Sequence, residues 1–297
     1  MSFIVVLASL LLNFYWRKDR MLPVDGLFDR WQVFLDSRAG QIPEGLRRWP
    51  GTLPLLAVLV PLLPVALLLW LADDVMLGLL TFALHLAVLV YCLPRVNLFM
   101  LAEDYLERWR RGNFEAACLH SETLVPGLFG DAVDDYADMH ARFTRYVLVT
   151  SFRRVMAVLF WYSLTGPLGA LFYVLVQQMI SHEVLLQEPA ARKLADQLLA
   201  LLEWVPVRLV SLAFALAGDF VAAFNYLRVR VLEGLDVEAG LDLLQDTAHQ
   251  SLGLDAAAHR ELEFAARASA ELEAVMALLQ RTQIVWIVVL ALIVLVV

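Results

Sequence analysis

Residues 52–93 read TLPLLAVLVPLLPVALLLWLADDVMLGLLTFALHLAVLVYCL, and this stretch decides the class of fold. A helix needs about 20 mainly apolar residues to cross a bilayer, and both Thr52–Leu71 and Val75–Leu93 meet that requirement. Only Ala72–Asp74 separates the two segments, so we expect a tight helical hairpin inside the membrane. Prolines 54, 61 and 64 interrupt the first segment. A bilayer helix tolerates proline when neighbouring groups satisfy the carbonyls that it frees.

The composition of the whole chain points the same way. Of the 297 residues, 61% are apolar and 18% are charged, against roughly 45–50% and about 25% in ordinary soluble domains. We therefore expect one integral membrane domain over residues 1–297, an all-α polytopic protein with about four to six membrane segments and helical extensions. The net charge of −8 and the absence of a basic domain argue against nucleic acid as a partner.

Four further segments are candidate membrane segments. Residues 155–176 are long enough for a full span, whereas 204–217 and 283–297 are short, because fifteen residues rise only about 23 Å in a helix. We expect 204–217 to be a short or kinked span and 283–297 to be the C-terminal span. Residues 1–16 lack the basic start and the small-residue cleavage site of a signal peptide. They are expected to form an uncleaved N-terminal anchor.

The distribution of basic residues predicts an orientation. If all six segments cross, residues 17–50, 94–154 and 218–282 share one side and hold 20 of the 23 lysines and arginines. The other side, residues 72–74 and 177–203, holds two. Because basic residues are retained in cytoplasmic loops, we expect the three long segments in the cytoplasm and both termini outside.

The cytoplasmic regions 94–154 and 218–282 are expected to be helical. The first contains a stripe of apolar residues at helical spacing, and Gly112 is placed to end that helix. Cys118 is expected to be a free thiol in a charged loop. The residues of the stripe are Leu98, Leu101, Tyr105, Leu106 and Trp109.

The segment Trp204–Leu209 (WVPVRL) is the most informative for function. An arginine inside an apolar run is a functional-site candidate, and Pro206 should free carbonyls near Arg208. Glu203 precedes the proline, and Asp219 shares the helical face of Arg208 about 16 Å further along. In the alternative interpretation, Arg208 reaches a lipid headgroup or forms an internal contact that fixes helix packing. The sequence leaves the two interpretations open.

Two adjacent arginines, Arg153 and Arg154, come immediately before the segment 155–176. The simplest interpretation is a positive anchor at the cytoplasmic end of a span. Two adjacent guanidinium groups also suit an anionic ligand, because arginine forms charge-assisted hydrogen bonds with carboxylates and phosphates.

Several motifs along the second half of the chain resemble those of the AmpE family. They are Arg145-Tyr146, Leu159-Phe160-Trp161, Gly166-Pro167-Leu168-Gly169-Ala170-Leu171, Tyr173, Glu203-Trp204-Val205-Pro206-Val207-Arg208-Leu209 and Ala215-Leu216-Ala217-Gly218-Asp219. The length and the order of apolar segments also agree, so the resemblance covers essentially the whole chain. It implies a bacterial inner-membrane sensor or signalling modulator. Such a protein would act beside a cytosolic anhydro-muramyl-peptide amidase in β-lactamase induction, peptidoglycan recycling and antibiotic resistance.

The same segments are more distantly similar to the CbiB/CobD cobinamide-phosphate synthases. The acidic and asparagine positions of that group fall here on residues such as Val149, Arg153, Ile180 and Leu199. Amide formation from a carboxylate needs activation, and hard metal ions need oxygen ligands. We therefore expect no catalytic residue, no metal ligand and no cofactor.

The resulting hypothesis is an AmpE-like modulator that binds an anionic peptidoglycan-derived or nucleotide-like ligand at its cytoplasmic face. The candidate ligand-binding residues are Arg208, Arg153, Arg154, Glu203, Asp219 and Trp204. A synthase of the CbiB/CobD type and a transporter of a small anionic solute are the alternatives. The sequence does not set the oligomeric state, and homo-oligomers are compatible with it.

Overall fold

A computed structural model describes residues 4–9, 12, 30–31, 52–72, 78–93, 98–130, 135–180, 186, 188–232, 234, 236–253 and 263–296. The regular elements in these ranges are helices, as the all-α prediction requires. In chain order they are α4 (Thr52–Ala72), α5 (Leu79–Cys92), α6 (Leu98–Arg110), α7 (Phe114–Leu124), α8 (Tyr136–Ser151), the π-helical turn η3 (Phe152–Met156), α9 (Ala157–Ile180), α10 (Pro189–Ala217), α11 (Phe220–Arg230), α12 (Val237–Ser251) and α14 (Phe264–Val296). Of the expected anchor 1–16, residues 4–9 are helical and most of the rest lies outside the described ranges.

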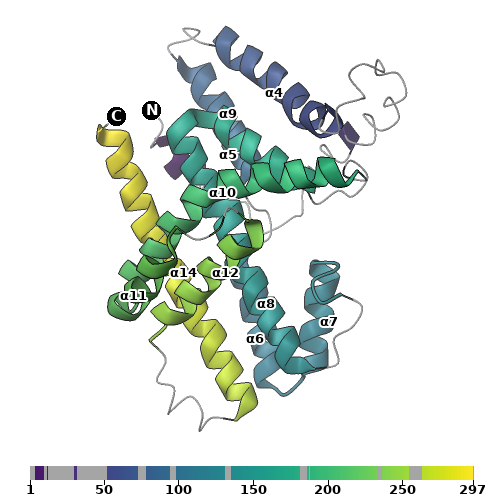
Figure 1. Ribbon diagram of the computed structural model, residues 1–297, viewed down its shortest axis with the longest axis vertical. Helices are drawn as coiled ribbons and strands as arrows, with labels where there is room; N and C mark the ends of the chain where they lie inside the picture. The colour runs from purple at the N-terminus through teal and green to yellow at the C-terminus, as the bar shows by residue number, and fades with distance from the viewer. Residues whose placement is uncertain are drawn as a thin grey trace.

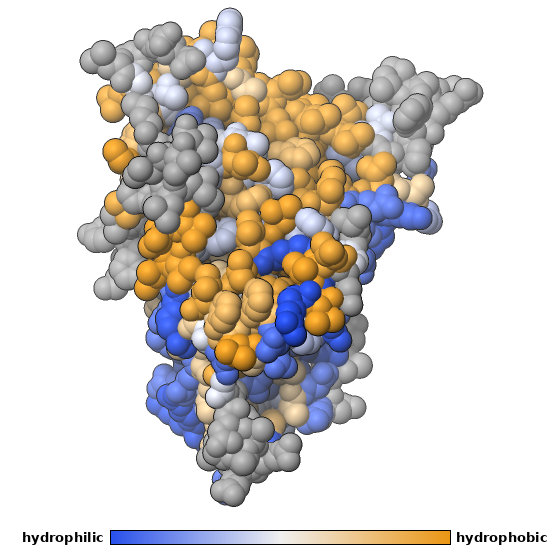
Figure 2. Space-filling model, turned by 60° about the vertical axis from the view of Figure 1, so that its left-hand side comes forward, coloured by the Kyte–Doolittle hydropathy of each residue, from blue (hydrophilic) through white to orange (hydrophobic). Residues whose placement is uncertain are grey.

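The molecule has an apolar half and a polar half. Helices α4, α5 and α9 and the end of α14 form the upper part in Figure 1, and hydrophobic side chains dominate that part of the surface in Figure 2. Helices α6, α7 and α8 and the start of α14 form the lower part, and α10 crosses between the halves. Four described helical stretches are long and apolar enough to cross a membrane: Pro54–Ala72, Tyr136–Ile180, Pro189–Ala217 and Phe264–Val289. The chain is a helical membrane protein.

In the region 52–93, where a hairpin was expected, the described residues form the two helices α4 and α5, and the connecting residues 73–77 lie outside the described ranges. Pro61 has no N–H for the carbonyl of Ala57, and the indole N–H of Trp31 donates to that oxygen instead at 3.1 Å. The second helix is shorter than predicted, because Gly78 at φ 79° comes before its first turn and α5 begins at Leu79. Its 14 residues rise about 21 Å, less than the hydrocarbon thickness.

The segment 155–176, predicted as one span, is instead part of a helical hairpin. Gly166 has φ 73° and ψ −160°, a conformation that is essentially restricted to glycine, and Pro167 follows it. The two arms of α9 fold back on each other. The evidence is that Arg153, just before the first arm, and Tyr173, on the second arm, both donate hydrogen bonds to Glu203. In an unbroken helix these residues would lie roughly 30 Å apart, beyond the combined reach of their side chains.

Helix α10 extends the predicted segment 204–217 by fifteen residues at its N-terminal end and so includes part of 177–203, the region expected between two spans on the outer side. Pro206 cannot donate to the carbonyl of Leu202, and the indole of Trp161 donates to it at 3.3 Å. The backbone around Pro206 is thereby tied to the first arm of α9. The C-terminal region is one continuous helix, α14, in which the predicted span 283–297 extends a polar helix that begins at Phe264.

The polar half has its own aromatic core. All five residues of the predicted stripe are buried in α6, and Gly112 at φ 75° ends that helix as predicted. The ring of Tyr105 stacks on Phe143 with centroids 3.9 Å apart. Cys118 is a free thiol, but it lies buried in α7 rather than in a charged loop. Burial raises the pKa of this thiol to about 11.

Candidate functional site

A cavity of about 600 Å³ lies at the junction of the two halves. The ends of several helices meet there: the end of α5, the start of α6, the α7–α8 connection, η3, the returning arm of α9 and the start of α12. Arginine is the most frequent residue in its polar lining. The four arginines in that lining are Arg142, Arg145, Arg153 and Arg154, and the one carboxylate among the described lining residues is Glu238. We call this space the arginine cavity.

The π-helical turn η3 positions two of these arginines. A π-turn inserts an extra residue into a helix and is frequent at functional sites, and here it contains both Arg153 and Arg154. Helix α14 holds the turn from outside, since Trp286 donates its indole N–H to the carbonyl of Met156 at 3.0 Å. Gln283 donates to the hydroxyl of Ser151 at 3.4 Å. The two guanidinium groups therefore project from a fixed piece of backbone.

Arg153 is held by a buried carboxylate on α10. Its Nε and Nη2 donate to the two oxygens of Glu203 at 2.8 and 3.0 Å, a bidentate geometry. The hydroxyl of Tyr173 donates to the same carboxylate at 3.0 Å. Glu203 is only 3% exposed, so it lies behind the cavity wall. It joins η3, α10 and the returning arm of α9.

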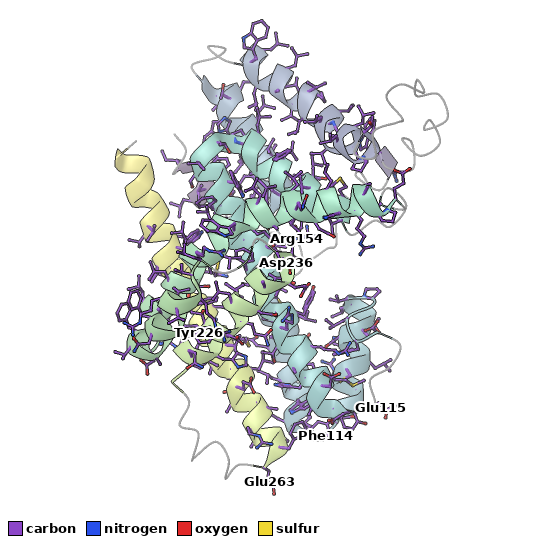
Figure 3. All side chains as sticks on the ribbon, in the orientation of Figure 1. Phe114, Glu115, Arg154, Tyr226, Asp236 and Glu263 are labelled. Carbon is purple, nitrogen blue, oxygen red and sulfur yellow. The ribbon has the colours of Figure 1, made fainter. Side chains whose placement is uncertain are left out.

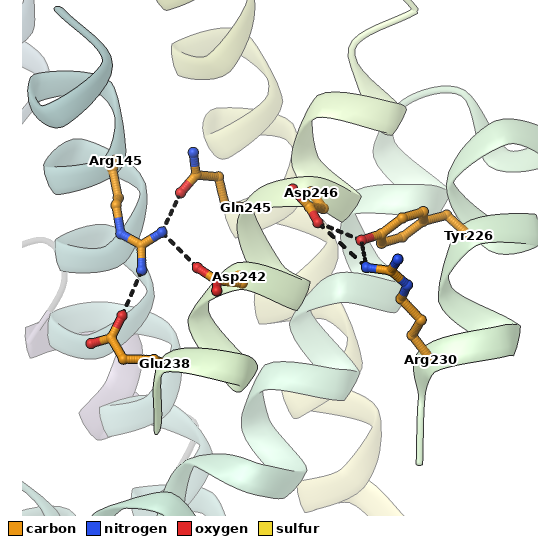
Figure 4. A network of polar contacts seen from close by, with 7 residues as sticks. All are labelled: Arg145, Tyr226, Arg230, Glu238, Asp242, Gln245 and Asp246. Carbon is orange, nitrogen blue, oxygen red and sulfur yellow. Dashed lines mark hydrogen bonds and ion pairs between the residues drawn. The ribbon is translucent and has the colours of Figure 1, made fainter. Parts of the chain in front are cut away.

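Arg145 and Arg142 are paired at the surface of the cavity. Arg145 donates to Glu238, Asp242 and Gln245 at 2.7–2.9 Å, and these three acceptors project from one face of α12 (Figure 4). Arg142 donates to Asp138 at 3.0 Å and to the carbonyl of Phe129 at 3.2 Å. Both arginines therefore have local counter-charges.

Arg154 differs from its three neighbours. Within the described residues it forms no hydrogen bond or ion pair, although it is half-buried and lines the cavity. It lies at the level where α10 crosses the molecule (Figure 3). The cavity thus holds one cation whose counter-charge is not supplied by the described part of the chain.

Arg208 lies in a separate cluster. Its Nε, Nη1 and Nη2 donate to the carbonyls of Val231, Trp204 and Gly234 at 2.5, 2.9 and 3.4 Å. Its guanidinium carbon is 4.1 Å from the centroid of the Trp204 ring. The alternative in which Arg208 fixes helix packing fits this geometry. Its guanidinium group, on α10, donates to the carbonyls of Val231 and Gly234, which follow α11.

Asp219 caps a helix. As the N-cap of α11 it accepts a hydrogen bond from the N–H of Ala222 at 3.1 Å. The preceding Gly218 allows α10 and α12 to end close together, because a Cβ there would lie 2.1 Å from the carbonyl oxygen of Ser251. Of the six candidate residues, the structure places Arg153 and Arg154 in the cavity and Glu203 directly behind it. Arg208, Trp204 and Asp219 do not line it.

The sequence analysis did not select Arg142 or Arg145 as site residues, although Arg145 belongs to one of the family motifs. A signal was available for Arg145, since Glu238, Asp242 and Gln245 recur at the spacing of one helical face. Their basic partner lies nearly a hundred residues away, so only the packing of α8 against α12 reveals the cluster. No group of three or more His, Cys, Asp or Glu side chains placed to hold a metal ion occurs among the described residues.

A comparison with protein families identifies the chain. The family model described as "Regulatory signalling modulator protein AmpE" matches residues 6–297, which is nearly the whole chain. The chain therefore belongs to the AmpE family. No curated protein and no solved structure matches it.

Proposed function

We propose that this AmpE-family signalling modulator acts in the bacterial inner membrane by binding an anionic ligand in the arginine cavity. The ligand class is a peptidoglycan-derived or nucleotide-like anion, and the output is β-lactamase induction during peptidoglycan recycling. A cytosolic anhydro-muramyl-peptide amidase is the proposed partner. The family supports the signalling role, and the observation that carries the ligand class is Arg154, a half-buried cation with no counter-ion in the described chain.

The surroundings of Arg154 explain how binding would be transmitted. The cavity is lined by six helix ends or connections, so an anion there would contact parts of both halves. A ligand shifts a conformational equilibrium only by its difference in affinity between two arrangements. Neutralising Arg154 favours the arrangement in which η3, α12 and the returning arm of α9 lie close together, and the exposed helices of the polar half present that change to a partner.

The hairpin in α9 supports a cytoplasmic location for the cavity. Because α9 folds back, Arg153 and Gln177 line the same space, which supports placing the described residues of 177–203 on the same side of the membrane as those of 94–154. Arg192 and Lys193, the two basic residues that the six-crossing scheme placed outside, then join the basic majority. An arrangement with fewer membrane crossings than six therefore satisfies the rule that basic residues stay in the cytoplasm more completely than the six-crossing scheme does.

The test is equilibrium binding of an anhydro-muramyl peptide and of a nucleoside diphosphate sugar to the purified full-length protein. Arg154→Gln should weaken binding of the true ligand class by about tenfold or more, and cells with this variant should lose β-lactamase induction. The control is Arg111→Gln, which removes the same charge from an exposed pair with Glu107 in the α6–α7 turn. Equal binding by Arg154→Gln and the unmodified protein would rule out the proposed site.

A further inference from the structure

A second cavity lies next to the arginine cavity, in the apolar half. This groove has a volume of about 490 Å³ and runs between α4, α5 and the returning arm of α9. Its walls are almost entirely hydrocarbon and aromatic. The lining residues that matter here are Pro61, Ala87, Val88, Leu171 and Leu175. We call it the apolar groove.

The two cavities are neighbours along two helices. Tyr91 lines both of them. On α5 the lining passes from Val88 in the groove to Leu93 in the cavity, about 8 Å along the helix. On α9 it passes from Leu175 in the groove to Gln177 in the cavity, about 3 Å further on. The two spaces therefore lie next to each other at Tyr91.

The chemistry changes sharply between these neighbouring spaces. One end offers four arginines, of which Arg154 lacks a partner in the described chain, and arginine is the side chain best suited to phosphate. The other end offers the apolar groove among helices of the apolar half. A small soluble anion would use only the charged end. An amphiphile with an anionic head and a hydrocarbon chain matches both ends at once.

We infer that the ligand of the arginine cavity is a membrane lipid with a phosphate headgroup, whose hydrocarbon chain lies in the apolar groove. The inference rests on the anion site of the proposed function, keeps Arg154 as its cationic group, and assigns it a lipid phosphate in place of the soluble anion named there. The phosphate binds Arg154, with Arg153 and Arg145 beside it, and Tyr91 lies at the junction of head and chain. The bilayer supplies such a ligand laterally, so the protein reports the level of a phosphorylated lipid.

The experiment uses full-length protein in detergent and three probes: dioleoyl phosphatidic acid, dioleoylglycerol and glycerol 3-phosphate. We expect phosphatidic acid to bind at least about tenfold more tightly than either of the other two. Arg154→Gln should weaken binding of both phosphate probes. Ala87→Trp fills the groove from an exposed position on α5. It should weaken the binding of phosphatidic acid by about tenfold and leave the binding of glycerol 3-phosphate unchanged.

The matched control is Ala83→Trp, one turn earlier on the same helix at another exposed position that does not line the groove. It should bind all three probes as the unmodified protein does. Equal affinity for phosphatidic acid and glycerol 3-phosphate, or an unaffected Ala87→Trp, overturns the lipid inference and leaves the anion site standing. If binding of no anion, including the anhydro-muramyl peptide, depends on Arg154, the proposed function fails as well.

Discussion

The arginine cavity and the Arg208 cluster both place arginine where burial is costly, yet they differ in what satisfies the charge. Arg208 is 8% exposed, and three carbonyls and the Trp204 ring surround its guanidinium group. Arg154 is half-buried without such acceptors in the described chain. An arginine in an apolar run is therefore not by itself a binding site. What identifies the site is a positive charge that the described residues leave without a counter-charge.

The largest effect on stability should come from Glu203, which ties the cavity wall to α10. Glu203→Gln leaves Arg153 without its buried counter-charge, and breaking such a pair typically costs about 3–5 kcal/mol. Thermal unfolding in detergent measures the loss. The double variant Arg153→Met/Glu203→Gln should recover part of it. No recovery in the double variant would mean that the two residues act independently.

The second largest effect should come from Arg208→Met. The carbonyls of Val231 and Gly234 lose their donor, and each unsatisfied buried acceptor costs about 1–3 kcal/mol. The protein should unfold at a lower temperature, while binding of phosphatidic acid by the folded fraction stays unchanged. A loss of binding with unchanged stability would instead make Arg208 a ligand residue and remove the contrast between the two regions.

A smaller effect is expected for Arg145→Gln. Its partners Glu238 and Asp242 are 71% and 60% exposed as side chains, and exposed ion pairs contribute only about 0.2–1 kcal/mol each. Raising the salt concentration should reduce the stability difference between this variant and the unmodified protein, because exposed pairs are screened. A difference that does not depend on salt would show that the cluster is not solvent-exposed.

Arg154→Gln should have the smallest effect on stability, below about 0.5 kcal/mol, because no described hydrogen bond or ion pair is lost. The same substitution should have the largest effect on anion binding. Measuring unfolding temperature and affinity on one protein sample separates the two roles. If Arg154→Gln destabilises the protein as much as Arg208→Met does, Arg154 has an internal partner and the distinction between the regions fails.

The sequence determined the class of fold. Apolar segments of spanning length predicted a helical membrane protein, and the helical spacing of the α6 stripe predicted its buried face. Family motifs identified the AmpE family, which the family model confirms. The sequence also selected Arg153, Arg154 and Glu203, which the structure brings together. These features could be predicted because they depend on local composition, periodicity or motifs.

Tertiary structure alone decided how the segments meet. The sequence showed a Gly166-Pro167 break, but it did not show that the chain reverses there, since reversal depends on contacts with α10. It likewise could not separate Arg208 from Arg154: both are cations beside apolar runs, and their difference lies in carbonyls supplied by residues distant in the chain. Local pattern fixes which side chains enter the membrane half, whereas the satisfaction of a buried charge is a property of the packed fold.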